Sequence, residues 1–315
     1  MKFHCVCLAP AVDATIRLNA WPSDGCIVKD AVETFIPGGK AVNVARWLAV
    51  RIRDGRDVRC TVSCTGLLGE DNAAMFEREL AAYGIEDRFV RVPGATRVNE
   101  MFVTPQGGFK VNRPAFPGLR DEDALVAAVV GRLELCAGDV MILSGSLPAG
   151  WSADACRVLV GKAKAAGATV VLDASGAALC EGVKAHPDVI KPNAEECAVL
   201  VGFVPKTPEE FRRATEALRK VCDRPIVSDG GAGCWFDGAF VSAPPVEVLD
   251  TTAAGDTLLA EWCWRTWGAA DAAPERWAVA AGSAACTMPG GTPPPVGLVE
   301  ALADDSIYKT TREDR

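Results

Sequence analysis

Short apolar runs alternate along the chain with longer stretches in which apolar residues recur at helical spacing. The apolar runs predict strands at about 3–8, 61–67, 139–144, 169–173, 188–191 and 225–228. The amphipathic stretches predict helices at about 41–50, 71–83, 121–136, 152–166, 194–201, 208–221, 256–267 and 274–287. Because strand and helix alternate, the pattern indicates βαβ units, which build a mostly parallel sheet covered by helices on both faces.

Two regions interrupt this alternation, at about 12–36 and 88–116. Neither contains a long helical pattern, and short runs at 15–18 and 101–103 read as strands. We therefore expect extended segments there that stand outside the βαβ units. The chain ends in a polar stretch, 306–315, which we expect to be a frayed tail.

Composition limits the classes of function. With 49% hydrophobic residues the chain can bury a substantial core, and no apolar run reaches the ~20 residues of a membrane span. The N-terminal residues lack the apolar region of a secretory signal, so we expect a cytoplasmic protein without membrane contact. The net charge of −8 and the absence of a long basic run argue against nucleic-acid binding. ATP remains possible, since glycine nests and helix starts bind phosphate within acidic proteins.

Cysteine and histidine usage also excludes several kinds of site. The thirteen cysteines include no Cys-x-x-Cys pair, so we expect free, mostly buried thiols rather than zinc or redox centres. Only His4 and His186 are present, and they cannot build a histidine-based triad or a multi-histidine metal site.

The segment 250–257, Asp-Thr-Thr-Ala-Ala-Gly-Asp-Thr, suggests a catalytic site. Small residues open a helix there, and Asp256 lies in its first turn. The unpaired N–H groups of a helix start attract an anion, and a neighbouring carboxylate can take a proton from a hydroxyl that attacks phosphorus. An ordinary capped helix is the simpler alternative.

A second segment, 37–49, reads Pro-Gly-Gly-Lys-Ala-Val-Asn-Val-Ala-Arg-Trp-Leu-Ala. Its glycines let backbone approach a ligand, and Asn43 lies about one helical turn after Lys40. The alternative is a Gly-Gly turn before an amphipathic helix, which leaves the polar residues at the helix start unexplained.

Together these segments resemble those of the ribokinase-like (PfkB) carbohydrate kinases, in particular the phosphofructokinase branch. Further matches follow in the family's order at 8–13, 144–150, 191–196 and 228–233. The resemblance implies a three-layer αβα sandwich with a mostly parallel central sheet, formed by one domain over 1–305. It also implies that 12–36 and 88–116 form a small β-sheet lid over the sugar, through which a homodimer is expected.

The resemblance implies a role for each polar segment. Asp256 would be the general base, and the N–H groups of Ala253, Ala254, Gly255 and Asp256 would stabilise charge on the transferred phosphoryl group. The residues expected around ATP are Lys191, Asn193, Ser228, Gly230 and Gly233, with the small residues at 280–284 near the adenosine. Asn193 and Glu196 would organise Mg²⁺ through water, unless Glu196 is simply a surface residue.

The residues expected around the sugar are Asp13, Gly38, Gly39, Lys40 and Asn43. Arg97 and Lys110, or Lys29, would bind a phosphate already on the sugar, unless they are solvated surface charges. The expected reaction is ATP-dependent phosphorylation of fructose 1-phosphate or fructose 6-phosphate to fructose 1,6-bisphosphate. The alternatives are a kinase of a free sugar or nucleoside, or a non-catalytic protein that binds sugar phosphates.

Two alanines depart from the family pattern, which usually has glycine at positions 253 and 41. If residue 253 needs a positive φ, its Cβ costs on the order of 1 kcal/mol. A P-loop is excluded because Lys40 is followed by Ala41 and Thr34 stands where the motif needs its first glycine. No Gly-x-Gly-x-x-Gly follows the first strand, so a dinucleotide-binding fold has little support.

Overall fold

The computed structural model describes residues 1–23, 25, 27–55 and 59–305, so the tail expected at 306–315 lies outside the described residues. Its largest element is a sheet in which the strands follow the spatial order β14-β13-β12-β11-β10-β9-β1-β4-β5, with β6 also paired to β4. The strands are β1 (Lys2–Cys7), β4 (Thr61–Gly69), β5 (Glu86–Asp87), β6 (Val90–Val92), β9 (Val140–Ser144), β10 (Thr169–Asp173), β11 (Val189–Ile190), β12 (Arg224–Ser228), β13 (Gly233–Phe236) and β14 (Ala239–Ser242). All neighbours from β12 to β5 are parallel, and β13 and β14 add an antiparallel edge.

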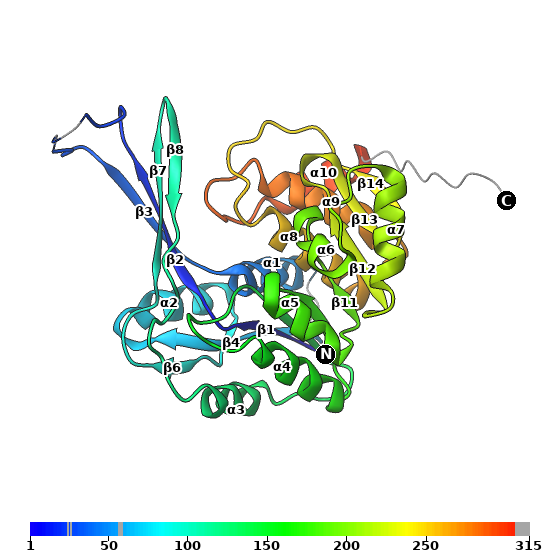
Figure 1. The fold of residues 1–315 in the computed structure, drawn as a ribbon. Helices are drawn as coiled ribbons and strands as arrows, with labels where there is room; N and C mark the ends of the chain where they lie inside the picture. The colour runs from blue at the N-terminus through cyan, green and yellow to red at the C-terminus, as the bar shows by residue number, and fades with distance from the viewer. Residues whose placement is uncertain (24, 26, 56–58, 306–315) are drawn as a thin grey trace.

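Helices cover both faces of this sheet (Figure 1). One face carries α1 (Lys40–Asp54), α2 (Ala73–Tyr83), α8 (Ala254–Cys263), α9 (Pro274–Ala285) and α10 (Val296–Asp305). The other carries α3 (Glu122–Leu133), α4 (Asp154–Ala165), α5 (Gly176–Gly182), α6 (Ala194–Val201) and α7 (Pro208–Leu218). Short 3₁₀ turns lie at η1 (Glu70–Asn72), η2 (Val183–Ala185) and η3 (Gly230–Ala232), and a π-helical turn, η4 (Trp264–Gly268), extends α8.

The strands are apolar on both sides because each side meets its own helical layer. In β1, Phe3 and Cys5 belong to the core beneath α1 and α8, whereas Val6 belongs to the core beneath α3 and α4. In β9, Ile142 belongs to the first of these cores and Met141 to the second. This period-two division explains why the central strands read as continuous apolar runs rather than as alternating ones.

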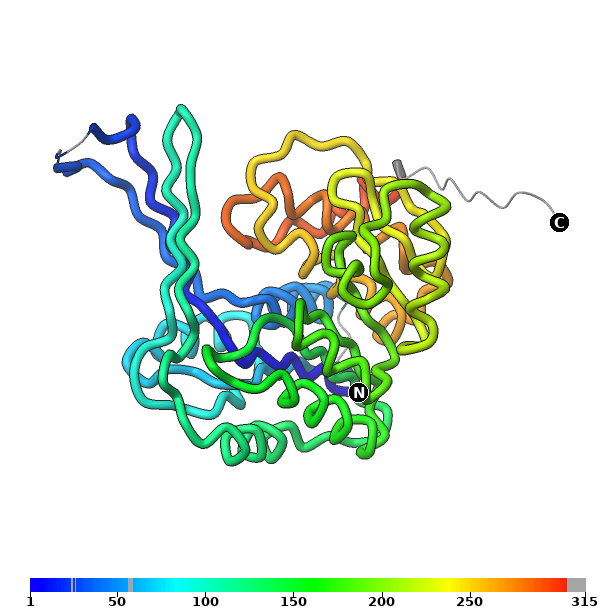
Figure 2. The backbone as a smooth tube through the Cα atoms, in the orientation of Figure 1, coloured from blue at the N-terminus to red at the C-terminus, as the bar shows by residue number. Residues whose placement is uncertain are grey.

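A smaller sheet stands apart from the sandwich, with strand order β3-β2-β7-β8. Its strands are β2 (Ala11–Arg17), β3 (Val32–Gly38), β7 (Val98–Thr104) and β8 (Gly107–Val111). Figure 2 shows the two hairpins rising from the body, across from the loop of residues 243–253 that leads into α8. The small sheet thus forms a separate wall that faces the start of α8.

The fold confirms the expected α/β sandwich with its additional small sheet, and every central strand expected from the sequence is present. The small sheet takes only the later part of 88–116, because β6 pairs with β4 in the main sheet. Helices α5 and α10 and the β13–β14 hairpin were not expected from the sequence. Within the described ranges no helix is long and apolar enough to cross a membrane, and the described cysteines are free thiols.

Candidate active site

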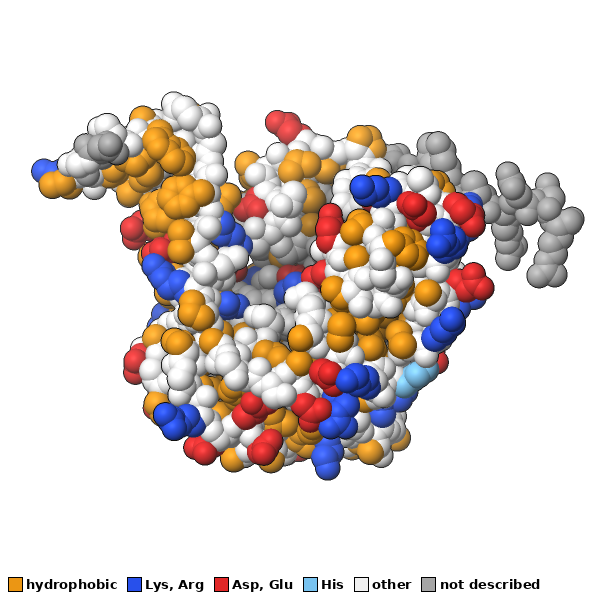
Figure 3. All heavy atoms as spheres, in the orientation of Figure 1, with side chains coloured by type: hydrophobic (Ala, Val, Ile, Leu, Met, Phe, Trp, Pro, Cys, Tyr) orange, Lys and Arg blue, Asp and Glu red, His pale blue; other side chains and the backbone are white. Residues whose placement is uncertain are grey.

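A cleft of about 840 Å³ lies between the small sheet and the start of α8, and Figure 3 shows it as a hollow with basic side chains on its walls. This volume suits a small-molecule site. Most of the residues expected at the site line the cleft: Asp13, Gly39, Lys40, Asn43, Arg97, Lys110, Lys191, Asn193, Glu196, Ser228, Ala253, Gly255 and Asp256. Gly38, Gly230, Gly233 and Ala254 do not line it. The segments that resemble those of a kinase therefore meet in one cleft.

The start of α8 has the geometry of an anion site. Ala253 caps the helix in the left-handed conformation, with φ of 64°, so the alanine stands where glycine would be unstrained. The N–H of Ala254 donates to the carbonyl of Thr251 at 3.3 Å. The N–H groups of Ala253, Gly255 and Asp256 have no partner in the part of the chain that the structure describes. Three of the four donors expected from the sequence are therefore available to an anion.

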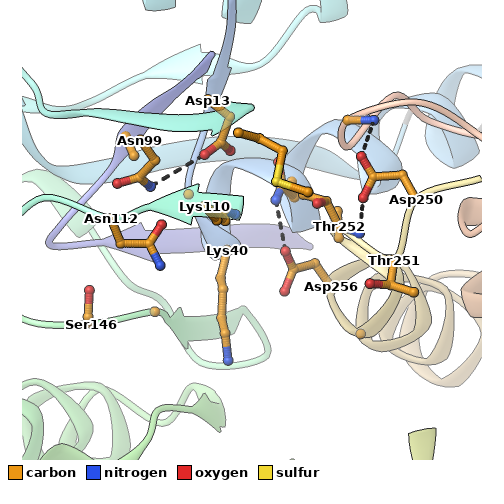
Figure 4. Close-up of a pocket in the computed structure, with 18 of the residues that line it drawn as sticks. Asp13, Lys40, Asn99, Lys110, Asn112, Ser146, Asp250, Thr251, Thr252 and Asp256 are labelled. Carbon is orange, nitrogen blue, oxygen red and sulfur yellow. Dashed lines mark hydrogen bonds between the residues drawn. The ribbon is translucent and has the colours of Figure 1, made fainter. Parts of the chain in front are cut away.

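Asp256 is buried at this helix start and keeps one well-defined partner. The Nδ2 of Asn43 donates to its Oδ2 at 2.8 Å (Figure 4). Burial, together with the nearby Asp173 carboxylate, raises the pKa of Asp256 to about 6, against the opposing effects of Lys40 and the Asn43 hydrogen bond. A carboxylate with this pKa is ionised at neutral pH and more basic than an ordinary aspartate, which suits a general base.

Asp173 was missed by the sequence reading, although it ends the strand expected at 169–173. It is fully buried, accepts a hydrogen bond from Ser144 Oγ at 2.7 Å, and pairs with the Nζ atoms of Lys40 at 3.3 Å and Lys191 at 3.2 Å. Burial favours its neutral form, but Lys191 and Lys40 outweigh this effect and hold its pKa below the ordinary value. Asp173 thus fixes two ammonium groups at the floor of the cleft. Its position at the carboxyl end of a parallel strand was the signal that could have revealed it.

The two lysines bring positive charge next to the helix start. Burial would lower the pKa of Lys40, but the carboxylates of Asp173, Asp256 and Glu196 outweigh it and hold that pKa above its ordinary value. A Cβ added to Gly255 would lie 3.5 Å from Lys191 Nζ, so this ammonium group lies directly over the first turn of α8. Lysines and backbone N–H groups therefore surround the same small volume, which is suited to phosphate.

Asp13 lines the same cleft from strand β2 (Figure 4). Its Oδ1 accepts a hydrogen bond from Asn99 at 3.4 Å, and burial raises its pKa while Lys110 offsets part of that effect. Gly38 lies beneath it, because a Cβ at Gly38 would approach Asp13 Oδ2 to 2.4 Å. The glycine thus leaves room for the carboxylate rather than contacting a ligand itself.

Arg97 lines the cleft, but its guanidinium N–H groups donate mainly to other groups of the protein. Its guanidinium donates to the carbonyls of Ala9 at 3.1 Å, Pro10 at 3.4 Å and Arg113 at 2.7 Å, and to Ser146 Oγ at 3.3 Å. It therefore braces the loop after β1 against the small sheet. Lys110 is exposed and lines the cleft, so its ammonium group is more available to a ligand than the guanidinium of Arg97. Lys29 is also exposed, but it does not line the cleft.

Asn193 and Glu196 form a capping box at the start of α6. The Asn193 side chain accepts from the Glu196 N–H at 2.7 Å, and Glu196 Oε2 accepts from the Asn193 N–H at 3.0 Å. The three-residue spacing is thus explained by helix capping. Among the described residues no group of three or more carboxylate, histidine or cysteine side chains could hold a metal ion. Glu196 nevertheless lines the cleft, which fits a Mg²⁺ held chiefly by phosphates and water.

Three glycine-containing segments have structural explanations. A Cβ at Gly233 would lie 2.1 Å from the carbonyl oxygen of Val241, so the glycine allows β13 to pair closely with β14. Gly230 opens the exposed turn η3 with φ of 52°. The residues at 280–284 are buried in α9, where a Cβ at Gly282 would lie 3.3 Å from the Cβ of Leu258 in α8. None of these three lines the cleft.

The cleft also contains polar residues that the sequence reading did not assign to a ligand. These are Asn99, Asn112, Ser146, Thr251 and Thr252. Those on the small sheet lacked a sequence signal, because their alignment with Asp13 depends on strand register: Asn99 lies opposite Asp13 in the β2–β7 pair.

Comparisons with known proteins show the family and the fold. Residues 7–294 match the family model described as pfkB family carbohydrate kinase. The chain is 35% identical over 271 residues to the 1-phosphofructokinase of Rhodobacter capsulatus, covering 82% of each chain. Its fold matches that of Escherichia coli phosphofructokinase-2 in complex with substrates and products, with a TM-score of 0.85, 23% identity, and coverage of 97% of this chain and 99% of that one. Ribokinase from Thermotoga maritima matches with a TM-score of 0.69 and 20% identity, covering 96% of this chain and 99% of that one.

Proposed function

Because the chain belongs to the pfkB family of carbohydrate kinases and is therefore an ATP-dependent kinase, we propose that it phosphorylates a ketohexose phosphate. The substrate is fructose 1-phosphate or fructose 6-phosphate, and the product is fructose 1,6-bisphosphate. Similarity to the 1-phosphofructokinases of Rhodobacter capsulatus and Vibrio cholerae favours fructose 1-phosphate of the two. The observation that carries the proposal is that one cleft is lined by Asp256, Lys40 and Lys191 and also by Asp13 and Lys110.

In this reaction Asp256 acts as the general base. Its Oδ2 is held by Asn43, so Oδ1 takes the proton as the sugar hydroxyl attacks the γ-phosphorus. The free N–H groups at the start of α8 and the ammonium groups of Lys40 and Lys191 stabilise the negative charge on the transferred group. Mg²⁺ supplied with ATP would neutralise phosphate charge, and Glu196 would hold it through water.

The part of the cleft around Asp13 and Lys110 selects the acceptor sugar. The carboxylate of Asp13 accepts hydrogen bonds from sugar hydroxyls, and the nearby Lys110 binds the phosphate that the sugar already carries. The commitment of Arg97 to backbone carbonyls makes it a support for this wall rather than the main phosphate ligand.

We further propose a homodimer through the small sheet. Hydrophobic side chains gather over this sheet in Figure 3, and Trp21, Val32 and Phe35 are between 47% and 62% exposed. A cluster of exposed apolar residues on a thin sheet favours burial against a second copy. The sheet would then serve as both lid and interface.

The function is tested by coupled ADP release over a panel of free and phosphorylated sugars with ATP and Mg²⁺. We expect turnover with a ketohexose phosphate and at least ~10²-fold lower kcat/KM with free fructose, because loss of a charged phosphate contact costs a few kcal/mol. Lys110→Met should remove most of this preference. Arg17→Met serves as the matched control, since Arg17 is an exposed cation on the same sheet that does not line the cleft. A preference for free ribose, fructose or a nucleoside would refute the substrate assignment.

A further inference from the structure

Arg46 is a buried arginine on α1, one turn beyond Asn43, and its side chain is 2% exposed. Two of its guanidinium nitrogens donate hydrogen bonds, and the third is in an ion pair. Nη1 donates to Asn43 Oδ1 at 3.3 Å and to the carbonyl of Gly291 at 3.0 Å, Nη2 donates to the carbonyl of Pro37, and Nε pairs with Glu79 at 2.9 Å. A buried charge with this many partners is held rigidly in one place.

The contact with Asn43 determines how the amide of that residue is turned. A guanidinium has only donors, so the atom that Asn43 presents to Arg46 must be its carbonyl oxygen. The other end of the amide is then the NH₂ group, which donates to Asp256 Oδ2 at 2.8 Å. If the amide turned over, two donors would face each other at Arg46 and two acceptors would face each other at Asp256. Both contacts are buried, so both mismatches would be costly.

The orientation of Asn43 matters because few groups act on Asp256. The charged or polar side chains that face it are Asp173 from β10, Lys40 and Asn43 from α1, and Lys191 from the segment after β11. Among the residues that the structure describes, Asn43 alone donates a hydrogen bond to its carboxylate. That bond occupies Oδ2, whereas Oδ1 accepts no hydrogen bond from the described residues, and Asp256 lines the cleft.

Arg46 also touches the two segments that frame the cleft. Pro37 belongs to β3 of the small sheet, and Gly291 belongs to the loop between α9 and α10. A Cβ at Gly291 would lie 3.7 Å from both Ala253 and Asn43 Oδ1, so this loop packs directly on the start of α8. Through Asn43, the Arg46 guanidinium therefore connects β3 of the small sheet to the carboxylate of Asp256.

We propose that Arg46 is a positioning residue that sets the amide of Asn43 so that it donates to Asp256 Oδ2 and leaves Oδ1 as the proton acceptor. Arg46 acts through Asn43 and touches no substrate. The structural claim stands on the hydrogen bonds alone, and only its kinetic consequence rests on the proposed kinase reaction.

The direct test is ¹³C NMR titration of the Asp256 carboxyl in ¹³C-aspartate-labelled protein, with the signal assigned from its loss in Asp256→Asn. Arg46→Met and Arg46→Lys should both raise the pKa of Asp256, because methionine has no donor and the single nitrogen of lysine cannot keep the Asn43 contact together with those to Pro37, Gly291 and Glu79. Arg46→Lys keeps the positive charge, so a rise in that variant separates amide orientation from loss of charge, and it also serves if Arg46→Met does not fold. In an Asn43→Ala background, adding Arg46→Met should produce less than half the rise seen with Asn43 present.

Arg51→Met is the matched control. Arg51 is also buried on α1, and it pairs with Glu261 rather than with Asn43. This variant should lose stability without moving the pKa of Asp256. An unchanged Asp256 pKa in Arg46→Lys, or an equal rise with and without Asn43, would overturn the proposal.

Measurements of kcat and its pH profile distinguish a failure of this inference from a failure of the proposed function. If the wild type turns over a sugar phosphate, Arg46→Lys should lower kcat by at least ~10-fold and move the acid limb of its pH profile upward, with little change in KM. Turnover in the wild type with an unchanged acid limb in Arg46→Lys would contradict the positioning role and leave the proposed function intact. Absence of turnover in the wild type would contradict the proposed function, while the NMR titration still decides the role of Arg46.

Discussion

Replacing Asp256 with asparagine should stabilise the protein while removing its activity. Asp256 is 7% exposed and lies among Asp173, Lys40 and Asn43. Asparagine has nearly the same shape, and its Oδ1 can still accept the hydrogen bond from Asn43 Nδ2. The substitution therefore removes a buried negative charge without opening a cavity. The folded state no longer has to hold that charge away from water.

The magnitude follows from the pKa. The pKa of Asp256 rises from 3.8 to about 6 on folding, and each pH unit corresponds to about 1.4 kcal/mol. Below pH 3.8 the carboxyl is protonated in both states and affects stability little. Between pH 3.8 and about 6 the unfolded state ionises while the folded state keeps its proton, so the free energy of unfolding falls; above about 6 the loss is complete. At pH 8 the destabilisation is about 3 kcal/mol, and at pH 4.5 it is about 1 kcal/mol.

Urea unfolding of the wild type and Asp256→Asn at pH 4.5 and pH 8 measures this difference. We expect the variant to gain about 3 kcal/mol at pH 8 and about 1 kcal/mol at pH 4.5, with turnover at least ~10³-fold lower. Asp123→Asn is the control, because Asp123 also lies in the first turn of a helix but is exposed. It should lose a few tenths of a kcal/mol through the helix dipole. A variant of Asp256 that is less stable than the wild type at pH 8, or that gains equally at both pH values, would show that no buried charge is held there.

Three further predictions follow from the same structure. Ala253→Gly should raise the free energy of unfolding by about 0.5–1 kcal/mol in urea titrations, because glycine relieves the left-handed strain while losing part of the gain to unfolded-state entropy; a loss of stability would contradict the strain. Asp173→Asn should move the acid limb of the kcat profile to lower pH, since the Asp173 carboxylate raises the pKa of Asp256, and an upward shift would contradict this. Phe35→Lys should weaken a dimer by at least ~30-fold in light-scattering dilution series, and an unchanged dimer would place the interface elsewhere.

Much of the fold could be predicted because its signals are local. The central strands are short apolar runs buried on both sides, and the long amphipathic helices separate them. The β13–β14 hairpin could also have been predicted, from the turn residues between its strands. Asp237 and Gly238 form its turn with φ of 51° and 87°, the arrangement that an Asp-Gly pair favours. Helix α5 is seven residues long and begins with glycine, so its sequence gave little periodicity to detect.

The site was predicted less completely because the residues that contact one another there are far apart in the sequence. The hydrogen bond between Asn43 and Asp256 spans 213 residues, and no pattern within either segment indicates it. The role of Asp173 depends on two lysines that reach it from different elements. Conversely, the spacing of Asn193 and Glu196 is a local capping signal, and the structure shows that capping accounts for it.

The central claim is that this cleft carries phosphate from ATP to a hydroxyl of a sugar that already bears one phosphate. The most direct measurement is ³¹P NMR of a mixture of enzyme, ATP, Mg²⁺ and fructose 1-phosphate, with fructose 6-phosphate in a parallel sample. The account predicts that fructose 1,6-bisphosphate and ADP appear in equal amounts in at least one sample, and that neither forms with Asp256→Asn. ADP released together with free inorganic phosphate, or no bisphosphate from either sugar, would contradict it.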